Sequence, residues 1–105
     1  MRLEIIPWTM TIDDIKKLIS KGETRTLELK KTTGELKDGM HSLCAFLNTD
    51  GGILIFGVSP TSLKIEGQIV SDKTRQEIAV EMRKLSLLSI SPSNTSMCLM
   101  GRANN

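Results

Sequence analysis

The hydrophobic pattern of the first thirty residues predicts a helix followed by a strand. Apolar residues recur at helical spacing across residues 12–20, and Thr11 with Asp14 three positions later is a typical cap for the start of that helix. In residues 25–30, RTLELK, leucines alternate with charged residues, as in a half-buried strand. This strand therefore carries an acid and a base on its solvent-facing side.

A second helix and a buried strand follow, separated by a turn. Thr32 or Thr33 can cap this helix, and residues 48–52, NTDGG, end it with residue types that favour left-handed and turn conformations. Residues 53–58, ILIFGV, are an almost continuous apolar run of strand length, which is typical of a strand covered on both faces. The apolar stripe of the helix consists of Leu36, Met40, Leu43, Cys44 and Leu47.

The second half of the chain predicts less regular structure. A turn at residues 59–62 leads to a short strand at residues 63–65, and Ser71 or Asp72 caps a third helix that runs to about Leu85. The remaining residues have no clean period and are rich in Ser and Asn, with a strand at residues 87–90 as one alternative. We expect one domain at residues 1–85 and a divergent or poorly ordered C-terminal tail at residues 86–105.

Composition narrows the classes of protein. A chain of 105 residues with 39% hydrophobic and 25% charged residues is long enough for a single globular core. A net charge of +2 does not indicate a polyanion binder, although a local basic patch would matter more than the total. The three aromatic residues Trp8, Phe46 and Phe56 are too few for a surface that stacks several successive bases.

The cysteines and the N-terminal residues indicate the cellular compartment of the protein. Cys44 and Cys98 form neither a disulfide framework nor a C-x-x-C zinc pair, so a reduced, cytoplasmic protein is expected. No apolar run is long enough for a membrane span, and Asp13 and Asp14 argue against a signal peptide. We interpret His41 as a packing or surface residue and Cys44 as a core residue.

Several motifs together resemble the Schlafen-type AlbA-like domain, which is found in bacterial transcriptional regulators and in the nuclease core of animal Schlafen proteins. The motifs are Glu23, an E-x-K strand with Glu28 and Lys30, the block CAFLNTDGG at residues 44–52, Gly57–Val58, and IEG at residues 65–67. The resemblance covers about residues 20–85. It implies an α+β fold, with a small mixed sheet flanked by about three helices, and a DNA-binding role in transcription regulation.

The resemblance also implies an alternative function, a metal-dependent RNA or DNA endonuclease. In that function Glu23 and Glu28 would bind Mg²⁺ or Mn²⁺ and Lys30 would stabilise a phosphate. Family members that cleave RNA carry an acidic pair after the GV dipeptide, where this chain has Ser59–Pro60, and Pro60 cannot bind a metal. Enzyme activity is therefore the less favoured reading. Asp50 or Glu66 are the remaining acids for a third ligand, and Glu28 with Lys30 can equally be a surface ion pair.

Two groups of residues are candidates for nucleic-acid contacts. Basic residues cluster around the predicted strand and the helix after it, and they would contact phosphates unless they are only a solvated face: Arg25, Lys30, Lys31 and Lys37. Backbone amides of the turn could cradle a phosphate, although a helix cap needs the same residue types: Asn48, Thr49, Asp50, Gly51 and Gly52.

ATP and a second protein chain are alternative partners. The turn is not a Walker loop, because no Gly-Lys-Ser/Thr follows it, so ATP binding ranks third. A protein-interaction domain, including a homodimer that completes an unfinished sheet, is a further alternative. We expect nucleic acid, DNA or RNA, as the partner and no membrane.

Overall fold

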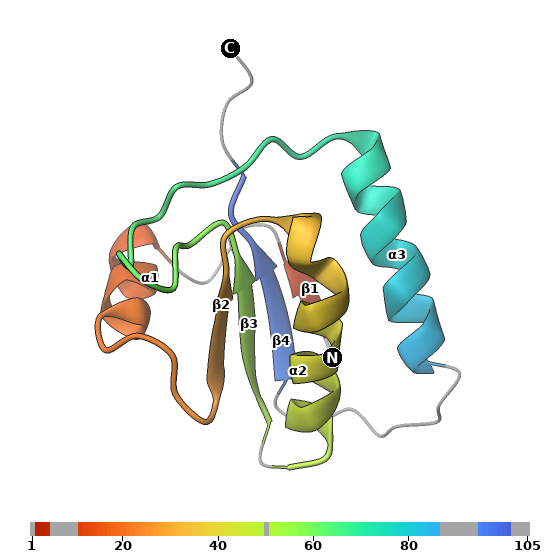
Figure 1. The fold of residues 1–105 in the computed structure, drawn as a ribbon, viewed down its shortest axis with the longest axis horizontal. Coiled ribbons are helices and arrows are strands. Elements are labelled where there is room, and N and C mark those ends of the chain that lie inside the picture. The colour runs from red at the N-terminus through yellow and green to blue at the C-terminus, as the bar shows by residue number, and fades with distance from the viewer. Residues whose placement is uncertain (1, 5–10, 50, 87–94, 102–105) are drawn as a thin grey trace.

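The computed structural model describes residues 2–4, 11–49, 51–86 and 95–101. Within them the chain forms β-strands, α-helices and one short 3₁₀ helix, as Figure 1 shows. The strands are β1 (Arg2–Glu4), β2 (Leu27–Lys30), β3 (Gly52–Phe56) and β4 (Thr95–Leu99). The helices are α1 (Ile12–Ile19), the 3₁₀ helix η1 (Thr33–Glu35), α2 (Leu36–Leu47) and α3 (Asp72–Ser86).

The strands form one sheet with the order β1-β4-β3-β2. The α+β class and the three flanking helices are confirmed, but all three strand pairs are parallel, so the expectation of a mixed sheet needs correction. The physical reason is that helices join β2 to β3 and β3 to β4, and such crossovers return the chain in the same direction. Antiparallel pairing in the described residues is limited to isolated bridges, Thr24–Leu27 and Val58–Ile65.

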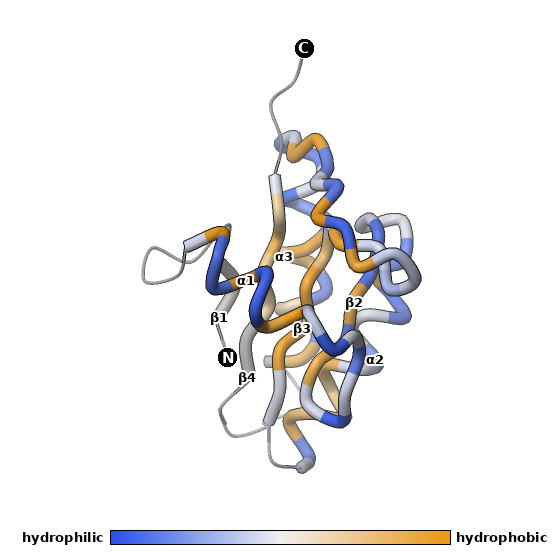
Figure 2. The backbone as a smooth tube through the Cα atoms, turned by 90° about the vertical axis from the view of Figure 1, so that its left-hand side faces the viewer, coloured by the Kyte–Doolittle hydropathy of each residue, from blue (hydrophilic) through white to orange (hydrophobic). Residues whose placement is uncertain are grey.

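The helices cover both faces of the sheet. The chain moves across the sheet in one direction from β2 through β3 to β4 and in the opposite direction from β1 to β2. Crossovers between parallel strands are right-handed, so a crossover that runs in the opposite direction along the sheet places its helix on the opposite face. Helices α2 and α3 therefore lie on one face and α1 on the other. Figure 2 shows α1 and α2 on opposite sides of the apolar strands.

Two hydrophobic clusters correspond to these faces. The cluster beneath α1 contains Ile15, Ile19, Leu27, Leu29, Ile55, Val58, Cys98 and Met100. The cluster beneath α2 and α3 contains Leu36, Met40, Leu43, Phe46, Leu54, Phe56, Ile78, Leu85, Met97 and Leu99. Because β3 and β4 contribute alternate residues to both clusters, their side chains are buried on both faces.

Strand β4 differs from the expected C-terminal tail. It lies inside the sheet between β1 and β3, and Met97, Cys98 and Leu99 are at most 3% exposed. The expected boundary after residue 85 therefore excludes a central strand of the domain. The strand considered at residues 87–90 lies outside the described residues, as do Trp8 and Asp50. The short strand expected at residues 63–65 is reduced to the single bridge from Ile65 to Val58.

Local signals place the first helices. At α1, Thr11 Oγ1 accepts from the Asp14 N–H at 3.1 Å and Asp14 Oδ2 accepts from the Thr11 N–H at 3.0 Å, which confirms the predicted cap. Thr32 accepts from the Gly34 N–H at 3.1 Å and so caps η1, which precedes α2. In the described part of the chain, none of the helices has the length and apolar character needed to cross a membrane.

Candidate nucleic-acid interface

The edge strand β2 carries a charged pair on the face opposite to α1. Leu27 and Leu29 are buried beneath α1, and the intervening Glu28 and the final Lys30 project to the other face. Lys30 Nζ lies 3.4 Å from Glu28 Oε1, and the two side chains are 16% and 26% exposed, respectively. The pair is thus half-buried at the margin of the sheet rather than fully solvated.

Glu23 joins this pair from the turn before β2. The N–H of Thr24 donates to Leu27 O and the N–H of Leu27 donates to Thr24 O, so the chain folds back on the free edge of the strand. Glu23 Oε2 then accepts from the N–H of Leu29 at 3.1 Å. These bonds satisfy two amides of the strand edge that would otherwise be open to another strand.

The two carboxyl groups affect one another. Burial raises the pKa of Glu28, and a hydrogen bond with Glu23 and the charge of Glu23 raise it further, while Lys30 opposes these effects. The structure therefore brings together Glu23, Glu28 and Lys30. In this arrangement the ammonium group of Lys30 already neutralises part of the acidic pair.

A metal centre of three carboxylates does not fit these residues. At the position of the missing acid, Ser59 is only 7% exposed and its hydroxyl lies 3.1 Å from Thr61 Oγ1, while the side chain of Pro60 has no ligating atom. Glu66 is paired with Lys31 at 3.8 Å. Across the described ranges, no three His, Cys, Asp or Glu side chains are placed to hold a metal ion.

The turn after α2 uses its polar groups internally. The N–H groups of Thr49 and Gly51 both donate to Phe46 O, at 3.2 Å and 3.0 Å, and Thr49 Oγ1 donates to Ala45 O at 3.0 Å. Asn48 Nδ2 donates to Cys44 O at 2.9 Å. Gly51, with φ +96°, and Gly52 are both buried. This geometry favours the helix-capping role over a phosphate cradle, because the Gly51 amide is already engaged.

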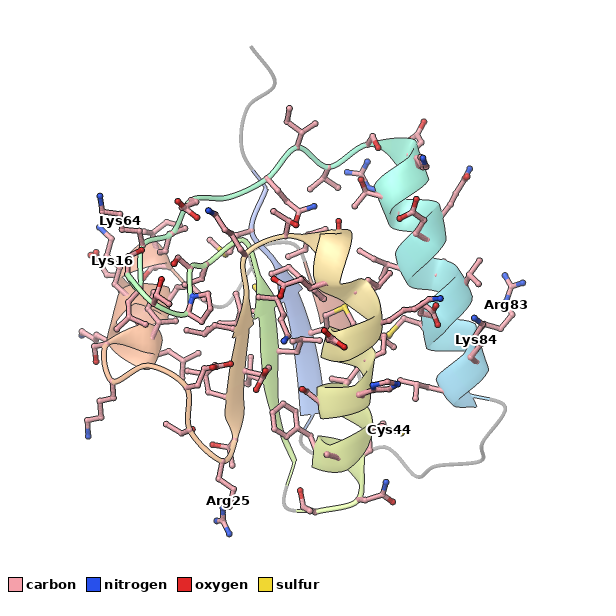
Figure 3. The ribbon with its side chains drawn as sticks, viewed as in Figure 1. Lys16, Arg25, Cys44, Lys64, Arg83 and Lys84 are labelled. Atoms are coloured by element: carbon pink, nitrogen blue, oxygen red, sulfur yellow. The ribbon has the colours of Figure 1, made fainter. Side chains whose placement is uncertain are left out.

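The predicted basic residues do not form one cluster. Arg25 precedes β2 and Lys31 follows it, so they lie at opposite ends of a strand about 10 Å long. Figure 3 shows Arg25 at the amino end of β2. Lys37 lies on α2 and lines a hollow of about 390 Å³ between α2 and α3, together with Glu81 and Lys84. His41 and Cys44 line the same hollow; His41 is exposed and Cys44 is half-buried at the margin of the core.

Sequence reasoning missed two lysines at the carboxyl end of the sheet. Lys16 on α1 and Lys64 after β3 are both exposed, and Figure 3 shows them on the same side of the molecule. The signal for Lys64 was present in the alternation of residues 63–66, in which Leu63 and Ile65 pack against the core and the charged residues between and after them face outward.

The fold and the site define a class of protein, an α+β domain with a parallel sheet and charged residues along its edge strand. The chain belongs to the family described as Schlafen, AlbA_2, whose model matches residues 23–100. This match includes β4 as well as the motifs of residues 44–52. No curated protein sequence matches the chain, and no solved structure matches it either. Membership of the family indicates a function related to nucleic acid.

Proposed function

We propose that this protein is a DNA-binding module of a transcriptional regulator that contacts the phosphates of the nucleic acid. The proposal rests on the family match and on the position of Lys31 at the carboxyl end of β2. In open parallel sheets, ligands bind outside the carboxyl ends of the strands. Phosphate contacts from lysine position such a protein on nucleic acid.

Lys31 is the observation that carries the proposal. Its side chain is 63% exposed, and its partner Glu66 lies 3.8 Å away and is itself 37% exposed. An ion pair with this exposure contributes about 0–1 kcal/mol, so a phosphate can replace the carboxylate at little cost. The backbone before Lys31 is fixed, because Lys30 O accepts from the N–H groups of Gly57 and Val58 at 2.8 Å and 3.3 Å.

The other predicted basic residues have different places in the proposal. Lys30 is paired with Glu28 and is only 16% exposed. Its charge therefore neutralises the carboxylate of Glu28 and is less accessible to a ligand. Arg25 lies at the opposite end of β2, and Lys37 lies on the face of α2 toward α3. We therefore expect Lys31 to contribute more to binding than any of these three.

The test is fluorescence polarisation of labelled duplex DNA, single-stranded DNA and hairpin RNA across a salt series. We expect binding whose logarithm falls linearly with the logarithm of salt concentration, with a slope of about −0.9 per duplex phosphate contact. Lys31→Glu should weaken binding about tenfold or more and make the slope shallower by about 1. Arg83→Glu on the exposed side of α3 is the matched control, with the same change in net charge.

Two results would overturn the proposal. One is the absence of binding by the wild-type chain to all three probes at low salt. The other is an equal loss of affinity in Lys31→Glu and Arg83→Glu, because a specific surface at the carboxyl end of the sheet requires the first substitution to have the larger effect. Thermal unfolding of both variants would show that each retains the fold.

A further inference from the structure

We infer that the phosphate-contacting surface extends from Lys31 across the hairpin after β3 to α1, where Lys64 and Lys16 complete it. This inference rests on the proposed function and deepens it, since it assigns the surface and the part of the nucleic acid that it takes. We call Lys16, Lys31 and Lys64 the carboxyl-end surface. Three separate segments of the chain supply these lysines, and the fold brings those segments together.

The hairpin after β3 holds Lys64 facing solvent. Its arms are joined by the bridge between Val58 and Ile65 and by the N–H of Ser59, which donates to Lys64 O at 3.0 Å. Leu63 and Ile65 pack against the cluster beneath α1. Lys64 and Glu66 are exposed, whereas Leu63 and Ile65, which flank Lys64, are partly buried.

Leu63 adopts a backbone conformation that residues other than glycine rarely adopt, so contacts within the hairpin must stabilise it. Its φ of +60° is unusual for a residue other than glycine, and the left-handed region costs roughly 1–2 kcal/mol for an L-residue. Its N–H donates to Ser59 O at 2.9 Å, and its side chain is packed against the core. The backbone that leads into Lys64 is therefore held by contacts within the hairpin.

The charges on this surface are unbalanced. Glu66 pairs with Lys31 and follows Lys64 by two residues, so it is the carboxylate between these two lysines. Lys16 follows Ile15 on α1, and Ile15 and Ile19 are both buried in the same cluster against which Leu63 and Ile65 pack. Within the described part of the chain, neither Lys16 nor Lys64 has an ion pair within 4.0 Å.

The chemistry that fits this surface is the phosphodiester backbone rather than the bases. Lysine ammonium groups bind phosphate as point charges. Stacking of bases requires exposed rings, and the two aromatic residues in the described ranges, Phe46 and Phe56, are 6% and 0% exposed. We therefore expect binding that is insensitive to base sequence.

The experiment compares the wild-type chain with two double variants that change the net charge equally. Lys16→Glu with Lys64→Glu alters the carboxyl-end surface and leaves Lys31 in place. Lys73→Glu with Arg83→Glu alters the exposed side of α3. Each protein is titrated with duplex DNA of two unrelated sequences, with single-stranded DNA and with hairpin RNA across a salt series, and its fold is checked by circular dichroism and thermal unfolding.

We expect the Lys16/Lys64 variant to bind at least tenfold more weakly than the α3 variant, with a duplex salt slope shallower by about 1.8 for two lost contacts. The two duplex sequences should bind equally. The titrations with DNA and with RNA show which nucleic acid supplies the phosphates. A loss of affinity for only one of them still supports the carboxyl-end surface as the binding site.

Failure of this inference differs from failure of the proposed function. If the wild-type chain binds and the two double variants are equally affected, the carboxyl-end surface is wrong while nucleic-acid binding stands. If the wild-type chain binds none of the probes, the proposed function itself is overturned. A strong preference for one of the two duplex sequences would contradict the assignment of the surface to the phosphate backbone.

Discussion

The two ends of the parallel sheet differ in what their polar and charged groups contact. At the amino end of β3, Gly51 and Gly52 are buried, and the amides of Asn48, Thr49 and Gly51 donate to carbonyl groups at the end of helix α2. At the carboxyl end, the carbonyl groups of Lys30 and Lys64 also accept backbone hydrogen bonds. The side chains of Lys31 and Lys64 are nevertheless exposed to solvent. At the amino end of β3 the polar groups of the turn therefore bond within the chain, whereas at the carboxyl end the lysine side chains are exposed.

This difference teaches that the most specific motif of the chain serves folding. The block of residues 44–52 is the most specific motif of the resemblance, but the polar groups of Asn48 and Thr49 and the amide of Gly51 bond to carbonyl groups of α2. Exposed lysines at the other end carry little family signal, since lysine is common on any surface. The motif that identifies the domain and the residues that we propose to bind a ligand are therefore different sets.

The largest effect expected from this comparison is on stability at the amino end. A Cβ atom added at Gly52 would lie 2.7 Å from two carbon atoms of the Phe46 ring, which itself is 6% exposed. Overpacking of this kind typically destabilises by about 1–3 kcal/mol. Gly52→Ala should therefore lower the free energy of unfolding by about that amount in urea, while nucleic-acid affinity measured on the folded protein stays unchanged.

Gly34→Ala is the matched control for this substitution. Its added Cβ would approach Thr32 Oγ1, the η1 cap, at 3.1 Å and at an exposed position, so any loss of stability should be smaller than that of Gly52→Ala. If Gly52→Ala were as stable as Gly34→Ala but bound nucleic acid more weakly, the turn would belong to the binding surface and the contrast between the two ends would fail.

A smaller effect is expected along the edge strand, where Glu28 lies between the two ends. The pKa of Glu28 is raised above its ordinary value of 4.5, so the folded protein binds this proton more tightly than the unfolded chain does. Stability contributed by this proton is present below pH 4.5 and is lost as the pH rises through the folded-state pKa. Glu28→Gln imitates the protonated form at every pH.

The stability of Glu28→Gln relative to wild type should therefore increase as the pH rises from the acid range to neutrality, by less than about 1 kcal/mol. Urea unfolding at a series of pH values measures it. Glu77→Gln, which removes the same charge at a 50% exposed position on α3, serves as the control. A difference that shrinks toward neutral pH would mean that the attraction of Lys30 outweighs burial and the neighbouring Glu23.

The smallest expected effect is that of divalent metal. A ligand that binds only the folded state raises the melting temperature. Because Lys30 lies against Glu28 and Ser59–Pro60 offers no carboxylate, millimolar Mg²⁺ or Mn²⁺ should leave the melting temperature unchanged. A rise in melting temperature that is seen in wild type but lost in Glu28→Gln would show that Glu23 and Glu28 bind metal. The edge strand β2 would then carry a second ligand site besides the carboxyl end of the sheet.

Local sequence signals predicted the helices and the inner strand well. The cap at Thr11 and Asp14 lies where the pattern placed it, and α3 ends within a residue of the expected Leu85. Near the acidic pair, the alternation in β2 predicted that Glu28 and Lys30 would share a face. These features depend on residues close together in the sequence.

Features that depend on distant residues were not predictable in the same way. The parallel direction of the sheet follows from which strands pair, and no local pattern specifies that choice. Strand β4 was missed because Met97, Cys98 and Leu99 are all buried, so the strand has no period of two, and its Ser- and Asn-rich surroundings suggested a tail. Lys16 and Lys64 lie 48 positions apart in the sequence, and packing around Leu63 brings their segments together.

The position of β4 has a consequence for biosynthesis. Strands β1 and β3 are both hydrogen-bonded to β4, which lies between them and is the last of the four strands to leave the ribosome. Until residues 95–99 emerge, β3 has one open edge and β1 lacks its partner in the sheet. Partly made chains with unpaired strand edges are prone to aggregate, so we expect the nascent chain to be most exposed to aggregation before residues 95–99 pair with β1 and β3.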